Sequence, residues 1–394
     1  MPWSTATPMS QRLEFIHAVI QQRLTMRAAC RQFAISEKTG YKWLARFTHG
    51  GPDALADRSH APMVPAHQVA AAVRDQICQL RDDHPTWGAR KLRAVLAATH
   101  PATTWPAPST ITAVLNRAGY IAPRRRSARE RGAWAATHLT TSRAPNDVWT
   151  ADFKGEFRLQ CGPYCYPLTV ADLQSRFVVG LRALAGTASE PTQAQFIRLF
   201  EHYGLPGVVR TDNGVPFGAP AALGGLSTFA VWLIRLGIRP ERIHPGCPQE
   251  NGAHERMHRT LKAETTRPAA ATFAAQQRRF DRWRQTFNVE RPHEALGLTP
   301  PAAHYTPSPR AYPRRLPALE YPPHVELRRV DGSGMIRWHS ERLFLSHVLI
   351  GEYVGLEETG DAEWTIALGP LRLGHYRARE AAFIEAVAWS SPPP

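Results

Sequence analysis

The stretch HPGCPQENGAHERMHRTLKAE, residues 244–264, leaves a loop rich in glycine and proline and enters a segment with helical spacing. Basic side chains dominate that segment, and between Gly252 and Ala263 the only acid is Glu255. An exposed ion pair contributes only about 0 to 1 kcal/mol, so pairing with a neighbouring cation explains Glu255 poorly. The alternative is that this carboxylate binds a ligand, and the other acidic residues of the chain indicate which kind of ligand.

Two further acids lie on or beside strand-like segments. Asp152 is inside DVWTADFKGEF, residues 147–157, and Asp212 directly follows VVRT, residues 208–211. Carboxylates at strand ends converge readily in an α/β sheet. Each also has a plain structural explanation, because an Asp before Asn-Gly is a common turn residue and an Asp on a strand can be an edge charge. Spacing alone leaves three rival acids open, namely Asp147, Asp172 and Glu250.

Three converging carboxylates repel one another unless a cation lies among them, and hard oxygen ligands with open positions select Mg²⁺ or Mn²⁺. Two such ions about 4 Å apart can activate the attacking oxygen of a phosphodiester displacement and stabilise the leaving oxygen. The candidate metal ligands and catalytic residues are therefore Asp152, Asp212 and Glu255.

The segments around these acids predict an α/β domain with a mixed sheet. Strand-like patterns cover residues 147–157, 164–174, 176–184 and 205–212. Helical patterns cover residues 190–204, 225–237 and the segment that holds Glu255. The first three strands follow one another closely, which favours an antiparallel meander. A loop is expected between the second helix and the helix of Glu255.

The N-terminal segment predicts a helix-turn-helix, because helical patterns at 12–22, 25–34 and 36–47 are separated by short breaks with Thr25 and Ser36 as N-caps. In such a unit the second helix of the pair enters the major groove of DNA with its N-terminal residues. The residues nominated for DNA contact are Ser36, Glu37, Lys38, Thr39 and Lys42. The expected core consists of Ile35, Tyr41, Trp43, Leu44 and Phe47. An ordinary three-helix bundle is the alternative.

A second small helical domain follows, and its last helix is expected to start at Ser109 as N-cap and to close on Gly119. Its role stays open between DNA binding and a spacing or dimerising function. The next segment, residues 123–145, is strongly basic and is predicted to be a linker. Phosphate contacts would suit the run Arg124, Arg125 and Arg126, although such charge runs are often only solvated.

The last part of the chain carries short strand-like segments bounded by turn residues, which predict a small all-β barrel, with a sandwich as the alternative. The predicted domains are a helix-turn-helix at 9–60, a second helical domain at 66–122, the basic linker at 123–145, a catalytic core at 146–305 and the β-barrel at 316–385.

Composition favours a polyanionic partner, since 48 Lys and Arg against 33 Asp and Glu give a net charge of +15. An arginine-favouring genome is the other explanation of this excess. No apolar run is long enough to cross a bilayer, and the first residues lack the apolar core of a secretion signal. We therefore expect a cytoplasmic protein with no membrane partner.

Three segments of the chain, VWTADFKGEF, VVRTDNGVPF and HPGCPQENGAHERMHRTLKAE, resemble the signature segments of the integrase core shared by retroviral integrases and bacterial insertion-sequence transposases, the DDE superfamily. Each signature acid of the family falls on one residue of this chain. The acid of the first segment is Asp152, that of the Asp-Asn-Gly motif is Asp212, and that of the third segment is Glu255.

Flanking segments extend the resemblance, since GGPDALADRSHAP, HPTWGARKL and FNVERPHEALGLTPPAAHY are similar to segments around the core of bacterial insertion-sequence transposases. A viral integrase would carry an N-terminal zinc module of two His and two Cys, and the spacing for it does not occur here. The resemblance therefore favours a transposase. One departure is FGAPAALGGL, residues 217–226, which has no clear counterpart in the family.

The resemblance implies an RNase H-like core with a mixed five-stranded sheet, which cuts the 3′ ends of a transposon with water and joins the new 3′ hydroxyls to target DNA. It implies two Mg²⁺ ions, replaceable by Mn²⁺, on the three acids. The implied partners are double-stranded DNA, as inverted-repeat ends and as target, and further copies of the chain in a dimer or tetramer, acting on the bacterial nucleoid. The alternatives are a non-catalytic DNA-binding regulator descended from a transposase and a structure-specific nuclease with an RNase H-like core.

The resemblance also bears on the cations that follow Glu255. Arg259 and Lys262 lie four and seven residues further on, on the same face of the predicted helix. One face then offers a metal ligand and two candidate phosphate contacts, which explains a carboxylate among cations. In the family, the position that matches Lys262 contacts the terminal DNA.

Overall fold

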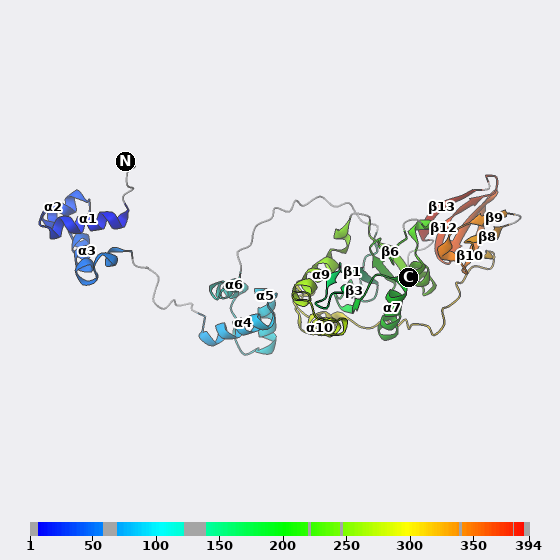
Figure 1. Ribbon diagram of the computed structural model, residues 1–394, viewed down its shortest axis with the longest axis horizontal. Coiled ribbons are helices and arrows are strands. Elements are labelled where there is room, and N and C mark those ends of the chain that lie inside the picture. Colours follow the sequence, from blue (N-terminus) through cyan, green and yellow to red (C-terminus); the bar gives the residue numbers. More distant parts are fainter. Residues whose placement is uncertain are drawn as a thin grey trace. The chain divides into compact units, whose positions relative to one another are not determined.

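The computed structural model describes residues 7–57, 69–121, 139–219, 222–244, 247–338, 341–380 and 382–389. The chain divides into two compact units, residues 1–70 and 71–394, and Figure 1 shows the elements of each. Each unit has a hydrophobic core of its own.

The first unit has the helix order expected of a helix-turn-helix. Its elements are α1 (Pro8–Ile20), α2 (Met26–Gln32), α3 (Glu37–Gly50) and a 3-10 turn (Pro52–Leu55). The predicted caps are confirmed, because the side chains of Thr25 and Ser36 accept backbone N–H groups in the first turns of α2 and α3. Gly40 lets α3 approach α2 closely, since a Cβ there would lie 2.6 Å from Sγ of Cys30.

The prediction that Tyr41 belongs to the core of this unit was wrong. Tyr41 is 57% exposed. The inward stripe of α3 instead contains the buried Gly40 and Trp43, with Leu44 and Phe47 packed against the core. At 3.6 residues per turn, a side chain one position after Gly40 leaves that stripe and joins the outward face. Aromatic character alone is therefore a poor guide to burial on this helix.

The second unit begins with three helices, α4 (Ala71–Asp83), α5 (Ala89–Thr99) and α6 (Pro108–Arg117). The predicted N-cap Ser109 was wrong, because α6 starts one residue earlier with Pro108 and its cap is Ala107. Proline suits the first helical position, where its missing N–H leaves no hydrogen bond unmade. The predicted close at Gly119 is confirmed by its φ of +81° just after the last turn.

The centre of the second unit is a mixed sheet, as predicted, with strand order β4-β3-β1-β5-β6. An antiparallel set contains β1 (Val148–Phe153), β3 (Tyr164–Asp172) and β4 (Val178–Leu184). A parallel set adds β5 (Val208–Thr211) and β6 (Arg239–Arg242) to β1. A sixth strand of two residues, β2 (Phe157–Arg158), pairs with the start of β3.

Two strand predictions were wrong. The expected single strand at 147–157 is broken into β1 and β2, and the expected loop after the second helix contains β6. The sequence of β6 is RPER, which shows no apolar alternation. Its proline is tolerated because β6 is the last strand of the sheet path. The carboxylate of Glu241 in β6 forms an ion pair with the buried Arg210 of β5 at 2.6 Å.

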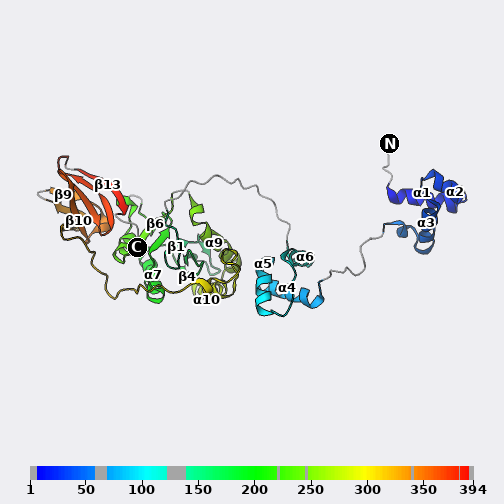
Figure 2. The same cartoon turned by 180° about the vertical axis from the view of Figure 1, so that it is seen from behind.

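Helices cover both faces of this sheet (Figures 1 and 2). Along β1, Trp149 and Ala151 face the aromatic cluster built with α7 (Ser189–Tyr203) and α8 (Thr228–Arg235). Thr150 and Asp152 face the opposite side, where they meet α9 (Gly252–Thr265). The chain then runs through α10 (Phe273–Gln285), a π-helical turn (Thr286–Glu290) and 3-10 turns at Glu294–Leu296 and Pro301–His304. The twofold periodicity of β1 thus directs Asp152 toward α9.

The C-terminal strands form two sheets. The larger, with order β13-β12-β11-β10-β7, comprises β7 (Glu326–Arg329), β10 (Tyr353–Gly360), β11 (Glu363–Leu368), β12 (Leu371–Arg377) and β13 (Ala382–Trp389). A hairpin of β8 (Met335–Trp338) and β9 (Glu341–Phe344) stands apart from it, with a 3-10 turn (His347–Leu349) after β9. Within the described residues neither sheet closes, so the predicted barrel is not formed. Strands of four residues, as in β7, β8 and β9, offer too short a ladder to connect the two edges.

The segment without a family counterpart packs against this C-terminal domain. Leu223 and Leu226 belong to the same buried cluster as the β-domain core. A Cβ on Gly224 would lie 2.6 Å from Val387 of β13, and the Gly224 N–H donates to Glu385. Residues 222–226 therefore join the domain of the mixed sheet to the β domain. In the part of the chain that is described, no helix is both long and apolar enough to span a bilayer.

Candidate functional site

Strand register brings two of the predicted acids side by side. β1 and β5 are parallel neighbours with Thr150 opposite Arg210. Asp152 and Asp212 each follow two residues later, at the same edge of the sheet. Glu255 lies in the first turn of α9, which packs over the face of β1 that carries Asp152.

The charges of these acids act on one another. Burial, the negative charge of Asp212 and, more weakly, that of Glu255 together raise the pKa of Asp152 to about 7, against the opposing positive charge of Lys154. Burial also raises the pKa of Asp212, although the Gly214 N–H donates to its Oδ1 at 3.2 Å and works the other way. Ionisation of Asp152 and of Asp212 therefore costs free energy, which a nearby cation would offset.

The rival acids have other partners. Oδ2 of Asp147 accepts the backbone N–H groups of Arg143 and Ala144 at 2.8 and 2.7 Å. The buried Asp172 accepts from the N–H and hydroxyl of Ser175. Glu250 accepts the N–H of His244 and lies 2.9 Å from its ring. Their roles are those of turn and loop residues.

A groove of about 560 Å³ runs beside Asp152 and Glu255. Arg259 and Lys262, the two cations predicted to share a helical face with Glu255, line the same groove and are exposed. Sequence reasoning missed two more cations in its lining, Lys154 and Arg267. Lys154 had a visible signal, since it is two residues after Asp152 and so continues on the same face of an extended segment.

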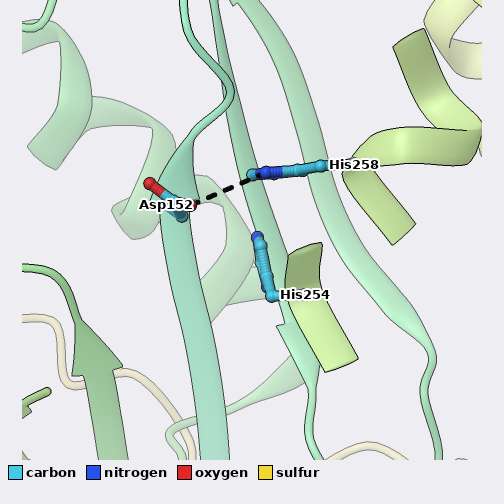
Figure 3. Close-up of side chains that lie close together, drawn as sticks. All are labelled: Asp152, His254 and His258. Atoms are coloured by element: carbon cyan, nitrogen blue, oxygen red, sulfur yellow. Dashed lines mark ion pairs between the residues drawn. The ribbon is translucent and has the colours of Figure 1, made fainter. Parts of the chain in front are cut away.

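Two histidines of α9 were also missed, and Figure 3 shows them beside Asp152. One nitrogen each of His254 and His258 and one carboxylate oxygen of Asp152 lie within 4.8 Å of one another. The signal was a pair of histidines at positions i and i+4, which share a helix face. Such a group could in principle hold a metal ion.

His254 has no nitrogen free for a metal. Its Nδ1 lies 2.8 Å from the hydroxyl of Thr150 and its Nε2 lies 2.6 Å from the hydroxyl of Thr169. Burial lowers its pKa to about 3, which keeps the ring neutral. His254 therefore fixes α9 to β1 and β3.

His258 is different because one of its nitrogens faces Asp152. The hydroxyl of Thr169 has one proton, which it donates to the backbone carbonyl of Asp152 at 2.9 Å. Nε2 of His258, 2.6 Å from that hydroxyl, must then be the donor to it. Burial lowers the pKa of His258, so the ring is neutral and Nδ1 keeps its lone pair, 3.6 Å from Oδ2 of Asp152. Nδ1 of His258 and Oδ2 of Asp152 are therefore two acceptors that face each other, and a proton or a cation could bind between them.

The residues nominated for DNA reading lie at the start of α3. Ser36 accepts the N–H of Thr39 at 3.2 Å and the two hydroxyls lie 2.8 Å apart, so both side chains take part in capping. Lys38 and Lys42 are exposed, and the exposed Tyr41 stands between them in the sequence. The outward face is thus basic and aromatic. The nominated Arg124, Arg125 and Arg126 lie outside the described residues.

Comparison with protein families gives matches along most of the chain. Two models described as integrase core domain match residues 142–248 and 236–301. A helix-turn-helix domain model matches residues 11–63, and a homeodomain-like model matches residues 39–115.

The relatives include proteins of insertion elements and of viruses. A 39.2 kDa protein of insertion element IS476 from Xanthomonas euvesicatoria is 30% identical over 254 residues, 62% of this chain and 66% of that protein. A 31.7 kDa protein of insertion element IS407 from Burkholderia multivorans is 29% identical over 196 residues, 48% and 65% of the two chains. The matches thus span slightly under two thirds of these relatives. The Pol polyprotein of feline endogenous virus ECE1 is 29% identical over 129 residues, 32% of this chain and 12% of the polyprotein.

Among solved structures, the integrase catalytic core domain of HTLV-2 in complex with magnesium is 15% identical, with a TM-score of 0.31 and coverage of 42% of this chain and 98% of that one. The simian T-cell lymphotropic virus intasome is 17% identical, with a TM-score of 0.35 and coverage of 75% and 97%. The two integrase core models thus identify an integrase core domain within residues 142–301, and the chain is similar to proteins of bacterial insertion elements.

Proposed function

We propose that this protein is the transposase of an insertion sequence, which binds the inverted-repeat ends, cleaves them at their 3′ ends and joins the 3′ hydroxyls to target DNA. The observation that carries this proposal is the placement of Asp152 on β1 and of Asp212 directly after the neighbouring parallel strand β5, with Glu255 on α9 and two exposed cations in the groove of Asp152 and Glu255. The proposed partners are double-stranded DNA and further copies of the chain, in the bacterial cytoplasm.

The donor set fits divalent metal ions. Hard carboxylate oxygens select Mg²⁺ or Mn²⁺, and burial together with the neighbouring negative charges raises the pKa of Asp152 to about 7, which a bound cation would reverse. In the proposal Asp152, Asp212 and Glu255 hold two Mg²⁺ ions. When bound, such ions activate an attacking oxygen and stabilise a leaving oxygen on phosphorus.

The remaining residues of the groove bind and orient DNA in this proposal. Arg259 and Lys262 stand one and two turns from Glu255 and would contact phosphates next to the cleaved bond. The N-terminal unit would read the ends through α3, with Lys38 and Lys42 on its exposed face. Specificity and cleavage then belong to different units of the chain.

The test is a joining assay with duplex oligonucleotides that carry the inverted repeat flanking this reading frame, a supercoiled target and Mg²⁺. A transposase yields target DNA covalently joined to the oligonucleotide. Cleavage without joined product would instead identify a nuclease with the same core. Sequence-specific binding with neither product would identify a DNA-binding regulator.

A further inference from the structure

A second cavity, of about 360 Å³, lies on the other flank of α9. α9 contributes Ala253, Arg256 and Thr260 to it, whereas Glu255, Arg259 and Lys262 line the groove of the acids. At 100° per residue these two sets are centred roughly 125° apart around the helix axis, on either side of its buried face. The cavity is therefore a site distinct from that groove.

The cavity is lined by cations from several elements. Arg176 comes from the turn between β3 and β4, Arg256 from α9, Arg291 from the segment after α10, and Lys91 from α5. Besides its burial, the positive charge of Arg256 lowers the pKa of Arg176. Burial and the charge of Arg291 lower the pKa of Lys91 to about 8. The positive charges of these residues therefore repel one another. This repulsion raises the free energy of the folded protein when no anion lies in the cavity.

The acids near this cavity, which are Glu264, Asp172 and the lining residue Glu294, neutralise only part of the charge of its four cations. Glu264 pairs with Arg291 at 3.0 Å. Both carboxylate oxygens of Asp172 accept hydrogen bonds, from Asn146 and from Ser175. The negative charge of Asp172 still favours the ionised form of Arg176. Arg176 and Arg256 have no side-chain hydrogen bond in the described structure.

Two polar atoms in the lining are buried and unpartnered. Within the described residues, Nη1 of Arg176 and Nε2 of His293 have no hydrogen-bond partner. A buried donor left unpaired costs about 1 to 3 kcal/mol. The turn fixes Arg176 in place, with φ of +64° and its N–H donating to the Asp172 carbonyl at 3.1 Å. The fold therefore holds a guanidinium donor at a position where nothing in the chain accepts from it.

We propose that this cavity binds a phosphate group of the DNA backbone, with Arg176 and Arg256 as its main ligands and His293 as a further donor. The planar fork of a guanidinium matches the oxygens of a phosphate, and two forks with an imidazole N–H can satisfy one such group. The nucleic-acid source of the phosphate rests on the proposed function. α9 would then contact DNA on both flanks, at the cleaved bond on one side and at a second phosphate on the other.

The first arm of the test uses inorganic phosphate as the probe on the full chain. Thermal unfolding is compared in phosphate and in chloride of equal ionic strength, for the wild type, for Arg256→Gln and for Arg176→Gln with Arg256→Gln. The control is Arg282→Gln, an exposed arginine of α10 outside the cavity. We expect phosphate to raise the Tm of the wild type and of the control by about 2 to 4 °C, and to raise that of the double variant much less. No phosphate shift in the wild type, or equal shifts in all four proteins, would overturn the site.

The second arm identifies the source of the phosphate through the salt dependence of binding to duplex DNA. Because the two arginines would neutralise one backbone phosphate, their loss should lower the slope of log K against log salt by about one unit in the double variant. A phosphate shift with an unchanged DNA slope would contradict a backbone phosphate and indicate a small phosphorylated ligand. Asp152→Asn, which lies in the other groove, should keep both the shift and the slope. If wild-type cleavage fails while these two signals persist, the proposed function is wrong and the phosphate site stands.

Discussion

The hydroxyl of Thr169 lies 2.6 Å from Nε2 of His258, inside the layer between the sheet and α9. The same hydroxyl also lies 2.6 Å from Nε2 of His254 and donates to the carbonyl of Asp152. One side chain on β3 therefore ties the helix of Glu255 to the strand of Asp152. The distance between two candidate metal ligands depends on this contact.

Thr169→Val should destabilise the protein strongly, because it leaves two buried imidazole N–H groups without an acceptor. Each such group costs about 1 to 3 kcal/mol, so we expect a loss of about 2 to 6 kcal/mol in the free energy of unfolding. Denaturant unfolding measures it. The matched control is Thr192→Val, equally buried in α7, whose hydroxyl donates only to a carbonyl of its own helix. Equal losses in the two variants would show that the histidine pair does not depend on Thr169.

The metal-free protein should lose stability as pH rises from about 4 to about 7, through Asp152. Its pKa in the folded state, about 7, is raised above the ordinary 3.8, so the folded state binds the extra proton and deprotonation favours unfolding. The contribution is at most about 4 kcal/mol. Unfolding in EDTA at pH 5 and pH 8 measures it against Asp152→Asn, which should show a smaller loss. Added Mg²⁺ should stabilise the wild type more at pH 8 than at pH 5, and the reverse order would contradict the proposed ligands.

Removal of residues 1–60 should abolish the preference for the element's ends while most general DNA affinity remains. The residues nominated for base reading are in that segment, whereas most of the cations of the chain are not. Specific binding typically exceeds non-specific binding by about 10³ or more, so the ratio of the two affinities is the measurement. Tyr41→Ala should lower the same ratio without loss of stability, since Tyr41 is exposed beside Lys42. An unchanged ratio in the truncated protein would show that residues outside 1–60 recognise the ends.

Replacement of Arg259 and Lys262 by alanine should weaken DNA binding and lower its salt slope by about one unit per cation. Glu255→Gln should leave that slope nearly unchanged and eliminate joining, because the acid is proposed to bind metal rather than phosphate. Filter binding over a range of salt, together with the joining assay, separates the two defects. A double cation variant with normal slope and normal joining would make this face of α9 a solvated surface.

Parts of this architecture could be predicted because their cause is local. Thr25 and Ser36 are cap residues by their own hydrogen-bonding chemistry, and the largely apolar residues of β1 and β3 match the burial of these strands. β6, with the sequence RPER, could not be predicted. Its buried Glu241 forms an ion pair with Arg210 of β5, and that pair exists only once the two strands have paired. The same holds for Thr169, since nothing near it in sequence indicates two histidines 85 and 89 residues away.

The C-terminal domain shows a different limit. Its strands were expected from short strand-like segments bounded by turn residues. Such segments do not indicate which strand edges pair, and the hairpin of β8 and β9 is separate from the larger sheet. The cavity that holds Arg176 was equally hidden, because its cations come from four distant segments of the chain.

The most direct test of the account is Mg²⁺-dependent strand cleavage of end duplexes by Asp152→Asn, Asp212→Asn and Glu255→Gln, with binding to the same duplex measured in parallel. Asp147→Asn is the control, since that carboxylate accepts backbone N–H groups in a turn. The account predicts that the three variants bind the duplex as the wild type does and that none of them cleaves it, while the control cleaves normally. Cleavage at near the wild-type rate by Asp152→Asn or Asp212→Asn would contradict the proposed metal site.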